Sequence, residues 1–134
     1  MKKVLMILSL VGWMGFQGAA QKAPAKKAAA KSPCADPQDQ STMNRCAFED
    51  FQKADGELNK VYQQLLLKLE TAHKEKLKVA QRAWVAFRDA HCDCESFAFD
   101  GGSMQPLIRS SCLAQVTRER TKQLQATLKE IASQ

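Results

Sequence analysis

The segment AHCDCES at residues 90–96 concentrates the side chains of this chain that could carry out chemistry. It places His91, Cys92 and Cys94 almost side by side, with acidic residues between and after the two cysteines. Histidine and cysteine bind zinc or copper, a C-x-C pair can form a reducible disulfide, and a cysteine beside a base can act as a nucleophile. The same cysteines could instead form structural disulfides. The helices around the segment decide among these four interpretations.

Apolar residues recur every three or four positions in three segments, residues 42–71, 74–96 and 106–132. This spacing is typical of helices with one buried face. Gly101, Gly102 and Pro106 interrupt the pattern and indicate a loop. Ser41 or Thr42 is expected to cap the first helix. With no usable stretch of alternating polarity, the sequence predicts an all-α fold, an antiparallel three-helix bundle stapled by disulfides at one end.

In such a bundle, the start of the first helix, the end of the second and the start of the third meet at one end. All five cysteines fall there, and an exported chain would form two disulfides with one thiol left over. On a helix, Cys94 points about 200° away from Cys92, so Cys94 is predicted to be the free thiol. Three pairings of the others are open, and we favour Cys34–Cys92 with Cys46–Cys112. The five cysteines are Cys34, Cys46, Cys92, Cys94 and Cys112.

The other interpretations of AHCDCES fit the helix less well. Thiolates two residues apart on a helix splay away from each other, unlike the wider spacing of structural zinc sites. His91 cannot turn onto the adjacent Cys92, and His73 is expected at the opposite end of the bundle. We therefore predict no enzyme, no catalytic residue, no metal and no cofactor. A monomer and a Cys94-linked dimer are both open.

The first 33 residues are predicted to lie outside the folded domain. Residues 1–20 combine a basic start, an apolar run and a small-residue cleavage site, which is the pattern of a signal peptide. Residues 21–33 are rich in Ala, Lys and Pro and have nothing large to bury, which indicates a flexible tether. The domain is residues 34–134. A periplasmic or secreted location follows.

The formal charge of +6 belongs to this leader and tether. Six of the 20 basic residues precede residue 34 and all 14 acidic residues follow it, which leaves 14 of each sign in the domain. A neutral exported domain argues against nucleic-acid binding. The tether lysines could contact an anionic membrane or wall surface, although a solvated spacer is the favoured interpretation.

Three large side chains are predicted to have structural roles. Trp84 lies on the apolar stripe of the second helix, where core packing is favoured over a role as an exposed anchor. Arg88 and Arg120 fall near apolar faces and are expected to be held by ion pairs rather than by a ligand. The carboxylates considered for these pairs are Asp55, Asp89 and Glu119.

The predicted loop offers a binding surface at the cysteine end. Gly101, Gly102 and Ser103 would expose backbone donors and acceptors on a stapled loop, or the glycines would only allow a tight turn. Acidic residues cluster toward the same end and would favour a basic partner. These are Asp89, Asp93, Glu95 and Asp100.

Several motifs of the chain resemble the LprI-like lysozyme inhibitor family. They are MNRCA at 43–47, ADGELNKVYQQL at 54–65, AQRAWVAFRDAHC at 80–92, GGSMQPLIRSSCL at 101–113 and the spacing of Thr117, Arg120 and Thr121. The resemblance covers roughly residues 34–124. It implies a small, exported helical domain whose paired cysteines are Cys34, Cys46, Cys92 and Cys112, with Cys94 a departure from the family pattern.

The resemblance implies a non-enzymatic protein that binds a protein partner such as lysozyme. Lysozymes of the common animal type are strongly basic, so the acidic residues at the cysteine end would aid binding. Inhibition would be steric, with the loop covering the enzyme's cleft. The alternative is a structural or stress-related envelope protein that binds wall or membrane components through its tether.

Overall fold

The computed structural model describes residues 32–133 and contains three long helices. They are α1 (Gln40–Lys68), α2 (Thr71–Ser96) and α3 (Gln105–Ala132). Two short 3-10 helices, η1 (Pro33–Ala35) and η2 (Phe97–Phe99), precede α1 and follow α2. The predicted signal peptide and nearly all of the predicted tether lie outside the described residues.

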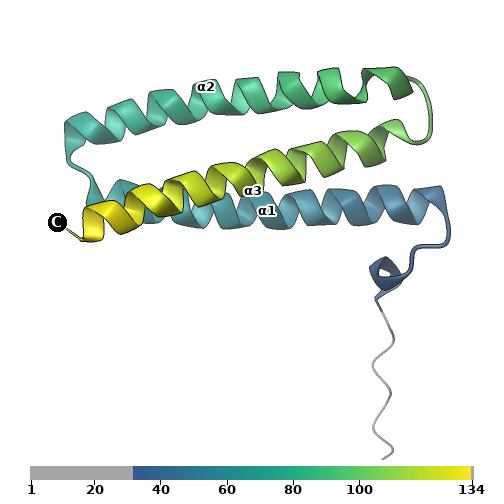
Figure 1. The fold of residues 1–134 in the computed structure, drawn as a ribbon, viewed down its shortest axis with the longest axis horizontal. Coiled ribbons are helices and arrows are strands. Elements are labelled where there is room, and N and C mark those ends of the chain that lie inside the picture. The colour runs from purple at the N-terminus through teal and green to yellow at the C-terminus, as the bar shows by residue number, and fades with distance from the viewer. Residues whose placement is uncertain (1–31, 134) are drawn as a thin grey trace, which may run out of the picture. The chain divides into compact units, whose positions relative to one another are not determined.

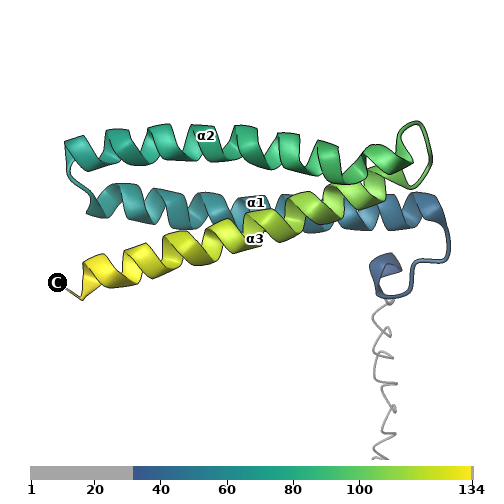
Figure 2. The ribbon, with the colours of Figure 1, turned by 45° about the horizontal axis from the view of Figure 1, so that its top comes forward.

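The three helices run antiparallel in chain order, as the sequence predicted (Figure 1). α3 packs closely along α1 and less closely along α2, and α1 and α2 make few direct contacts. In both views α2 lies at one margin of the bundle, with α1 and α3 together on its inner side (Figure 2). The described residues contain no strand, and none of their helices is long and apolar enough to cross a membrane.

The start of α1 differs from the prediction in its capping residue. Asp39, not Ser41 or Thr42, is the N-cap, and its extended backbone puts the carboxylate over the first turn. Asp39 Oδ1 accepts from the Thr42 backbone N–H at 2.8 Å, and Oδ2 accepts from the Thr42 hydroxyl at 2.8 Å. A carboxylate that accepts two hydrogen bonds here satisfies a free backbone donor and also suits the helix dipole.

The apolar core lies in the half of the bundle away from the cysteines. It contains Leu58, Val61 and Leu65 of α1 and Leu124 of α3, which are spaced so that one face of each helix is buried. Burying one leucine contributes about 2 kcal/mol. Other partly buried side chains pack against this core: Tyr62, Leu69, Leu77, Trp84, Leu128 and Ile131.

The interior near the cysteines is different in kind. Apart from Leu113, the buried side chains of this half are small or polar, so they remove less apolar surface from water than leucines do. This half needs another source of rigidity. The side chains are Arg88, Cys92, Ser96, Ser110, Ala114 and Thr117.

Candidate protein-binding end

Two disulfides lie at the predicted end of the bundle, but the favoured pairing is wrong. The bonds are Cys34–Cys46, with Cα atoms 5.5 Å apart, and Cys92–Cys112, with Cα atoms 5.6 Å apart. The four bonded cysteines are those that the sequence predicted. Cys94 is free, as predicted, and it is exposed.

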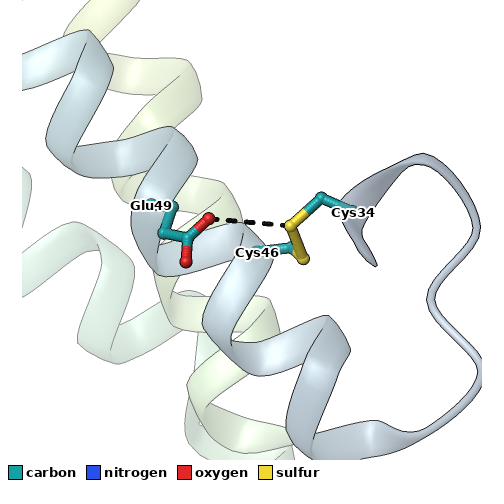
Figure 3. A group of neighbouring side chains, drawn as sticks. All are labelled: Cys34, Cys46 and Glu49. Carbon is teal, nitrogen blue, oxygen red and sulfur yellow. Dashed lines mark hydrogen bonds between the residues drawn. A yellow bond between two sulfur atoms is a disulfide. The ribbon is translucent and has the colours of Figure 1, made fainter. Parts of the chain in front are cut away.

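The turn between η1 and α1 explains why Cys34 does not reach Cys92. η1 folds back beside the first turns of α1, so Cys34 meets Cys46 only 12 residues later (Figure 3). Cys112 lies on the side of α3 that faces α2, where it bonds the completely buried Cys92. Cys34 therefore bonds the cysteine near the start of the adjacent α1, and Cys112 bonds the cysteine of α2 that faces α3.

The observed pairing changes what the disulfides hold together. One bridge ties the segment before α1 to α1 itself, and the other ties α2 to α3, so neither links α1 to the rest of the bundle. Each is expected to contribute about 3 kcal/mol by restricting the unfolded chain, as loops of this length do. Because Cys92 is bonded and buried, it offers no thiolate for nucleophilic attack or metal binding.

The Cys34–Cys46 bridge lies against a carboxylate, and the three side chains form a compact group (Figure 3). Glu49 Oε2 is 3.6 Å from Cys34 Sγ. A disulfide sulfur carries no hydrogen, so this approach is a van der Waals contact rather than a hydrogen bond. Bonded sulfurs are not thiolate ligands either, and Glu49 is already paired with Arg45 at 2.7 Å. The group is therefore not a metal site while the bridge is intact.

Residues 97–104, here called the 97–104 loop, join α2 to α3 and are held by several hydrogen bonds. The backbone N–H of Asp100 donates to the Phe97 carbonyl at 3.1 Å, and that of Gly102 donates to the Phe99 carbonyl at 2.9 Å. Asn44 of α1 donates its side-chain N–H to the Ser103 carbonyl at 2.9 Å. The loop is thus fixed to α1 by a hydrogen bond. The chain joins it to α2 and α3, which the Cys92–Cys112 bridge holds together.

The conformation of the loop explains why glycine occupies both position 101 and position 102. Gly101 has φ of 72°, in the left-handed region that glycine adopts readily. A Cβ on Gly102 would lie 3.1 Å from the Phe99 carbonyl oxygen, which accepts the Gly102 N–H. The tight-turn interpretation of the glycines therefore holds. Binding by their backbone is a separate matter and stays a prediction.

Three large apolar side chains of the loop are exposed, and the sequence interpretation missed them. Phe97 is 67% exposed, and Phe99 and Met104 are also open to solvent. Phe99 and Met104 border a shallow depression that also includes Asp100. The signal in the sequence was FAF placed directly after a helix, where no core remains to bury it. Aromatic side chains on a fixed loop are typical anchors for a protein partner.

The predicted acidic cluster is largely engaged in contacts within the chain. Asp89 pairs with Arg88 at 2.9 Å, Asp93 pairs with Arg109, and Asp100 accepts from the Gln105 side chain at 2.6 Å. Pairing with arginine reduces the field that a basic partner would feel. Of the four predicted acids, only Glu95 has no side-chain partner among residues 32–133.

Glu95 instead belongs to a groove of about 360 Å³ between α2 and α3. Glu119 and His91 also line this groove, and no lysine or arginine does. The His91 ring stacks on Phe87, with ring centroids 5.5 Å apart, which supports a packing role for this histidine. The groove offers two carboxylates to a basic side chain, and Glu119 is a member that the predicted cluster did not include.

Arg88 is the main polar tie between α2 and α1. Its guanidinium is almost fully buried, pairs with Asp55 at 3.1 Å, and lies 5.3 Å from the ring centroids of both Phe51 and Trp84. Together with Asp89, these contacts match the predicted structural role of Arg88. Cation–π contacts of this kind strengthen as the cation is removed from water.

Arg120 also has a structural position, but without a carboxylate. It donates to Gln81 of α2 at 3.2 Å and to Gln123 at 3.1 Å, and lies 5.9 Å from the Trp84 ring centroid. Burial lowers the pKa of the Arg120 guanidinium from its usual value. The ion pair predicted for this residue is therefore wrong, and Trp84 is half-buried between two arginines as part of the core packing.

These features define a small, disulfide-stapled helical domain with a fixed, apolar-tipped loop at one end. The family model described as Lysozyme inhibitor LprI matches residues 34–124, and the chain belongs to this family. It is 37% identical to an uncharacterized protein of Rhizobium meliloti (strain 1021), R02472, over 76% of this chain and 83% of that protein.

A solved structure shares the fold. The crystal structure of a DUF1311 family protein, PP0307 of Pseudomonas putida KT2440, matches with a TM-score of 0.62 and 28% sequence identity. The match covers 67% of this chain and 93% of that chain. The predicted family and the predicted three-helix fold are both confirmed.

Proposed function

We propose that this protein is an exported, non-enzymatic lysozyme inhibitor that binds the enzyme with the 97–104 loop and blocks its cleft. Membership in a family described as lysozyme inhibitors supports the partner class. The observation that carries the choice of surface is the fixed loop with exposed Phe97, Phe99 and Met104. A loop that is already ordered loses little entropy when it binds, so its apolar contacts translate into affinity.

Charge also favours the cysteine end of the molecule as the binding surface. The α2–α3 groove, which runs from Glu95 next to the loop to Glu119 in the middle of α3, contains no base and suits a lysine or arginine of a basic enzyme. The aromatic tips would supply most of the affinity and the carboxylates would raise the association rate. Gly101, Gly102 and Ser103 shape the loop in this proposal and contribute backbone groups at its tip.

Lysis of a bacterial cell-wall suspension by several lysozyme types tests the proposal. The protein, purified with its disulfides formed, should slow lysis by at least one type at micromolar concentration. Phe97→Asp should weaken inhibition by about tenfold or more, because it puts a charge at an apolar contact. Leu67→Asp is the matched control, since Leu67 is an 84% exposed apolar residue of α1 outside the loop. Full activity of every lysozyme type would refute the function, and equal effects of both variants would refute the surface.

The alternative role in binding wall or membrane components separates from inhibition through residues 21–33. If the lysine-rich segment is a surface tether, its deletion should release the protein from isolated envelopes and leave inhibition unchanged. Loss of inhibition on this deletion would contradict the assignment of binding to the 97–104 loop.

A further inference from the structure

The solvent side of α2 carries an apolar stripe that the bundle does not use. Five residues on this side, spaced alternately three and four positions apart, form what we call the α2 seam. Phe87, its largest member, is 58% exposed. The seam consists of Ala80, Ala83, Phe87, Ala90 and Cys94, all of which are exposed.

The spacing of the α2 seam is that of a helix which pairs with another helix. Alternating steps of three and four give the seven-residue repeat whose apolar positions interlock across two helices. α2 already uses its other side for the bundle, where Arg88 and Cys92 are buried. Both ribbon views place α1 and α3 on that inner side, so the seam has no cover among residues 32–133 (Figures 1 and 2).

The charges around the α2 seam indicate what kind of partner fits. From residue 79 to residue 96 the charged side chains of α2 all lie outside the seam, and they are Arg82, Arg88, Asp89, Asp93 and Glu95. An uncharged stripe does not select a basic or an acidic protein. The domain itself has 14 residues of each sign, so two copies approach without net repulsion. The alanines allow two helices to approach closely.

Cys94 identifies the partner as a second copy of this chain in a parallel arrangement. The thiol is free and exposed, and it occupies a seam position near the end of the helix. In a parallel pair of identical helices each seam residue faces its own counterpart. We propose that two copies of this protein dimerise through a parallel pairing of their α2 seams, which brings the two Cys94 thiols together.

The arrangement has a consequence for the cysteine end. Parallel α2 helices place both 97–104 loops at the same end of the dimer, so two binding loops would face the same direction. Because the α2 seam does not overlap the Cys92–Cys112 bridge, pairing leaves both bundles intact. Dimerisation is independent of lysozyme and is measured without it.

Sedimentation equilibrium of the purified full chain tests the interface. The protein should show a concentration-dependent dimer. Ala83→Glu and Ala90→Glu should each weaken dimerisation by about tenfold or more, because each puts two like charges in the apolar seam. Ala126→Glu is the matched control, as an exposed alanine on α3 that should leave the dimer unchanged. A monomer at every concentration, or a dimer insensitive to both seam variants, would overturn the proposal.

Disulfide trapping tests the parallel arrangement. With oxidised glutathione, two Cys94 thiols lose two protons and two electrons, and the oxidant is reduced to two glutathione thiols. A Cys94–Cys94 dimer should form quickly at dilutions where Cys94→Ser still dimerises without a covalent bond. The second arm mixes the wild type with a Cys94→Ser, Ala80→Cys variant. Covalent dimers within each type support a parallel pair, whereas predominant cross-linking between the two types would show an antiparallel pair and overturn the proposal.

Discussion

The two ends of the bundle are stabilised in different ways. Near the α1–α2 turn, leucines such as Leu65 and Leu124 fill the space between helices, and no cysteine lies there. Near the 97–104 loop the interior is small or polar, and two disulfides replace much of the missing apolar burial. The end that is proposed to bind a partner is thus held covalently, and the other end is held by packing.

This division leaves the apolar side chains of the cysteine end available at the surface. Phe97, Phe99 and Met104 are exposed there, whereas near the other turn Leu69 and Leu77 pack against the core and Leu67 is exposed. A bridge such as Cys92–Cys112 needs little volume, so it can fix a loop without drawing its aromatic residues inward. Covalent stapling and exposed contact residues are therefore compatible in a small domain.

Removing one core leucine should have the largest effect on stability. Leu65→Ala is expected to lower the free energy of unfolding by about 3–4 kcal/mol, since Leu65 is 1% exposed and its loss leaves a cavity. Denaturant unfolding measures this change. The exposed neighbour Leu67 provides the control, because Leu67→Ala should change stability by only about 0.5 kcal/mol. Equal effects would mean that the far end is not held by packing.

Removing the bridge between α2 and α3 should have a similar but more local effect. Cys92→Ala with Cys112→Ala is expected to cost about 3 kcal/mol, with the fastest amide exchange in the 97–104 loop. Cys34→Ala with Cys46→Ala should cost slightly less, because its loop is shorter, 12 rather than 20 residues in sequence separation. Amide hydrogen exchange locates the change. Uniform loosening of both ends would contradict the proposed division of the bundle.

The helices were predictable because their periodic apolar residues are the ones that pack. Leu58, Val61 and Leu65 recur every three or four positions, and this local pattern places each helix within a few residues. The antiparallel order followed from the short connections. That order gathers all five cysteines at one end, and the direction of Cys94 on its helix, away from Cys92, left the other four to be bonded.

The pairing and the binding surface were not predictable in the same way. Which cysteine Cys34 meets depends on how η1 folds back, and no periodicity describes that turn. The acidic cluster was predicted from positions along the chain alone. In the structure, Asp93 of α2 is paired with Arg109 of α3. Exposure of Phe97 depends on where α2 ends relative to the core. Each of these outcomes is set by three-dimensional contacts rather than by spacing along one helix.

Removing a buried hydroxyl in the cysteine half of the bundle should give a small gain in stability. Thr117 Oγ1 is buried and has no hydrogen-bond partner among residues 32–133. Thr117→Val is expected to stabilise the protein by about 1 kcal/mol, because it removes an unsatisfied polar group at nearly constant shape. Thr121→Val is the control and should destabilise by about 1 kcal/mol, since the Thr121 hydroxyl donates to the Thr117 carbonyl at 2.9 Å. Chemical unfolding compares the two, and a loss of stability in Thr117→Val would show that this hydroxyl is satisfied in solution.

The smallest expected effect is the acid sensitivity of the α1 cap. The backbone N–H of Thr42, and then its hydroxyl, hold the pKa of Asp39 below its usual value. A lowered pKa in the folded state means that this carboxylate stabilises the fold above its unfolded pKa and loses that contribution as pH falls through the folded value. The thermal midpoint of the wild type should therefore fall more between about pH 6 and about pH 2 than that of Asp39→Asn. Thr42→Val should give an intermediate dependence, because it retains the larger backbone hydrogen bond. Parallel curves for the wild type and Asp39→Asn would show that α1 does not depend on a charged cap.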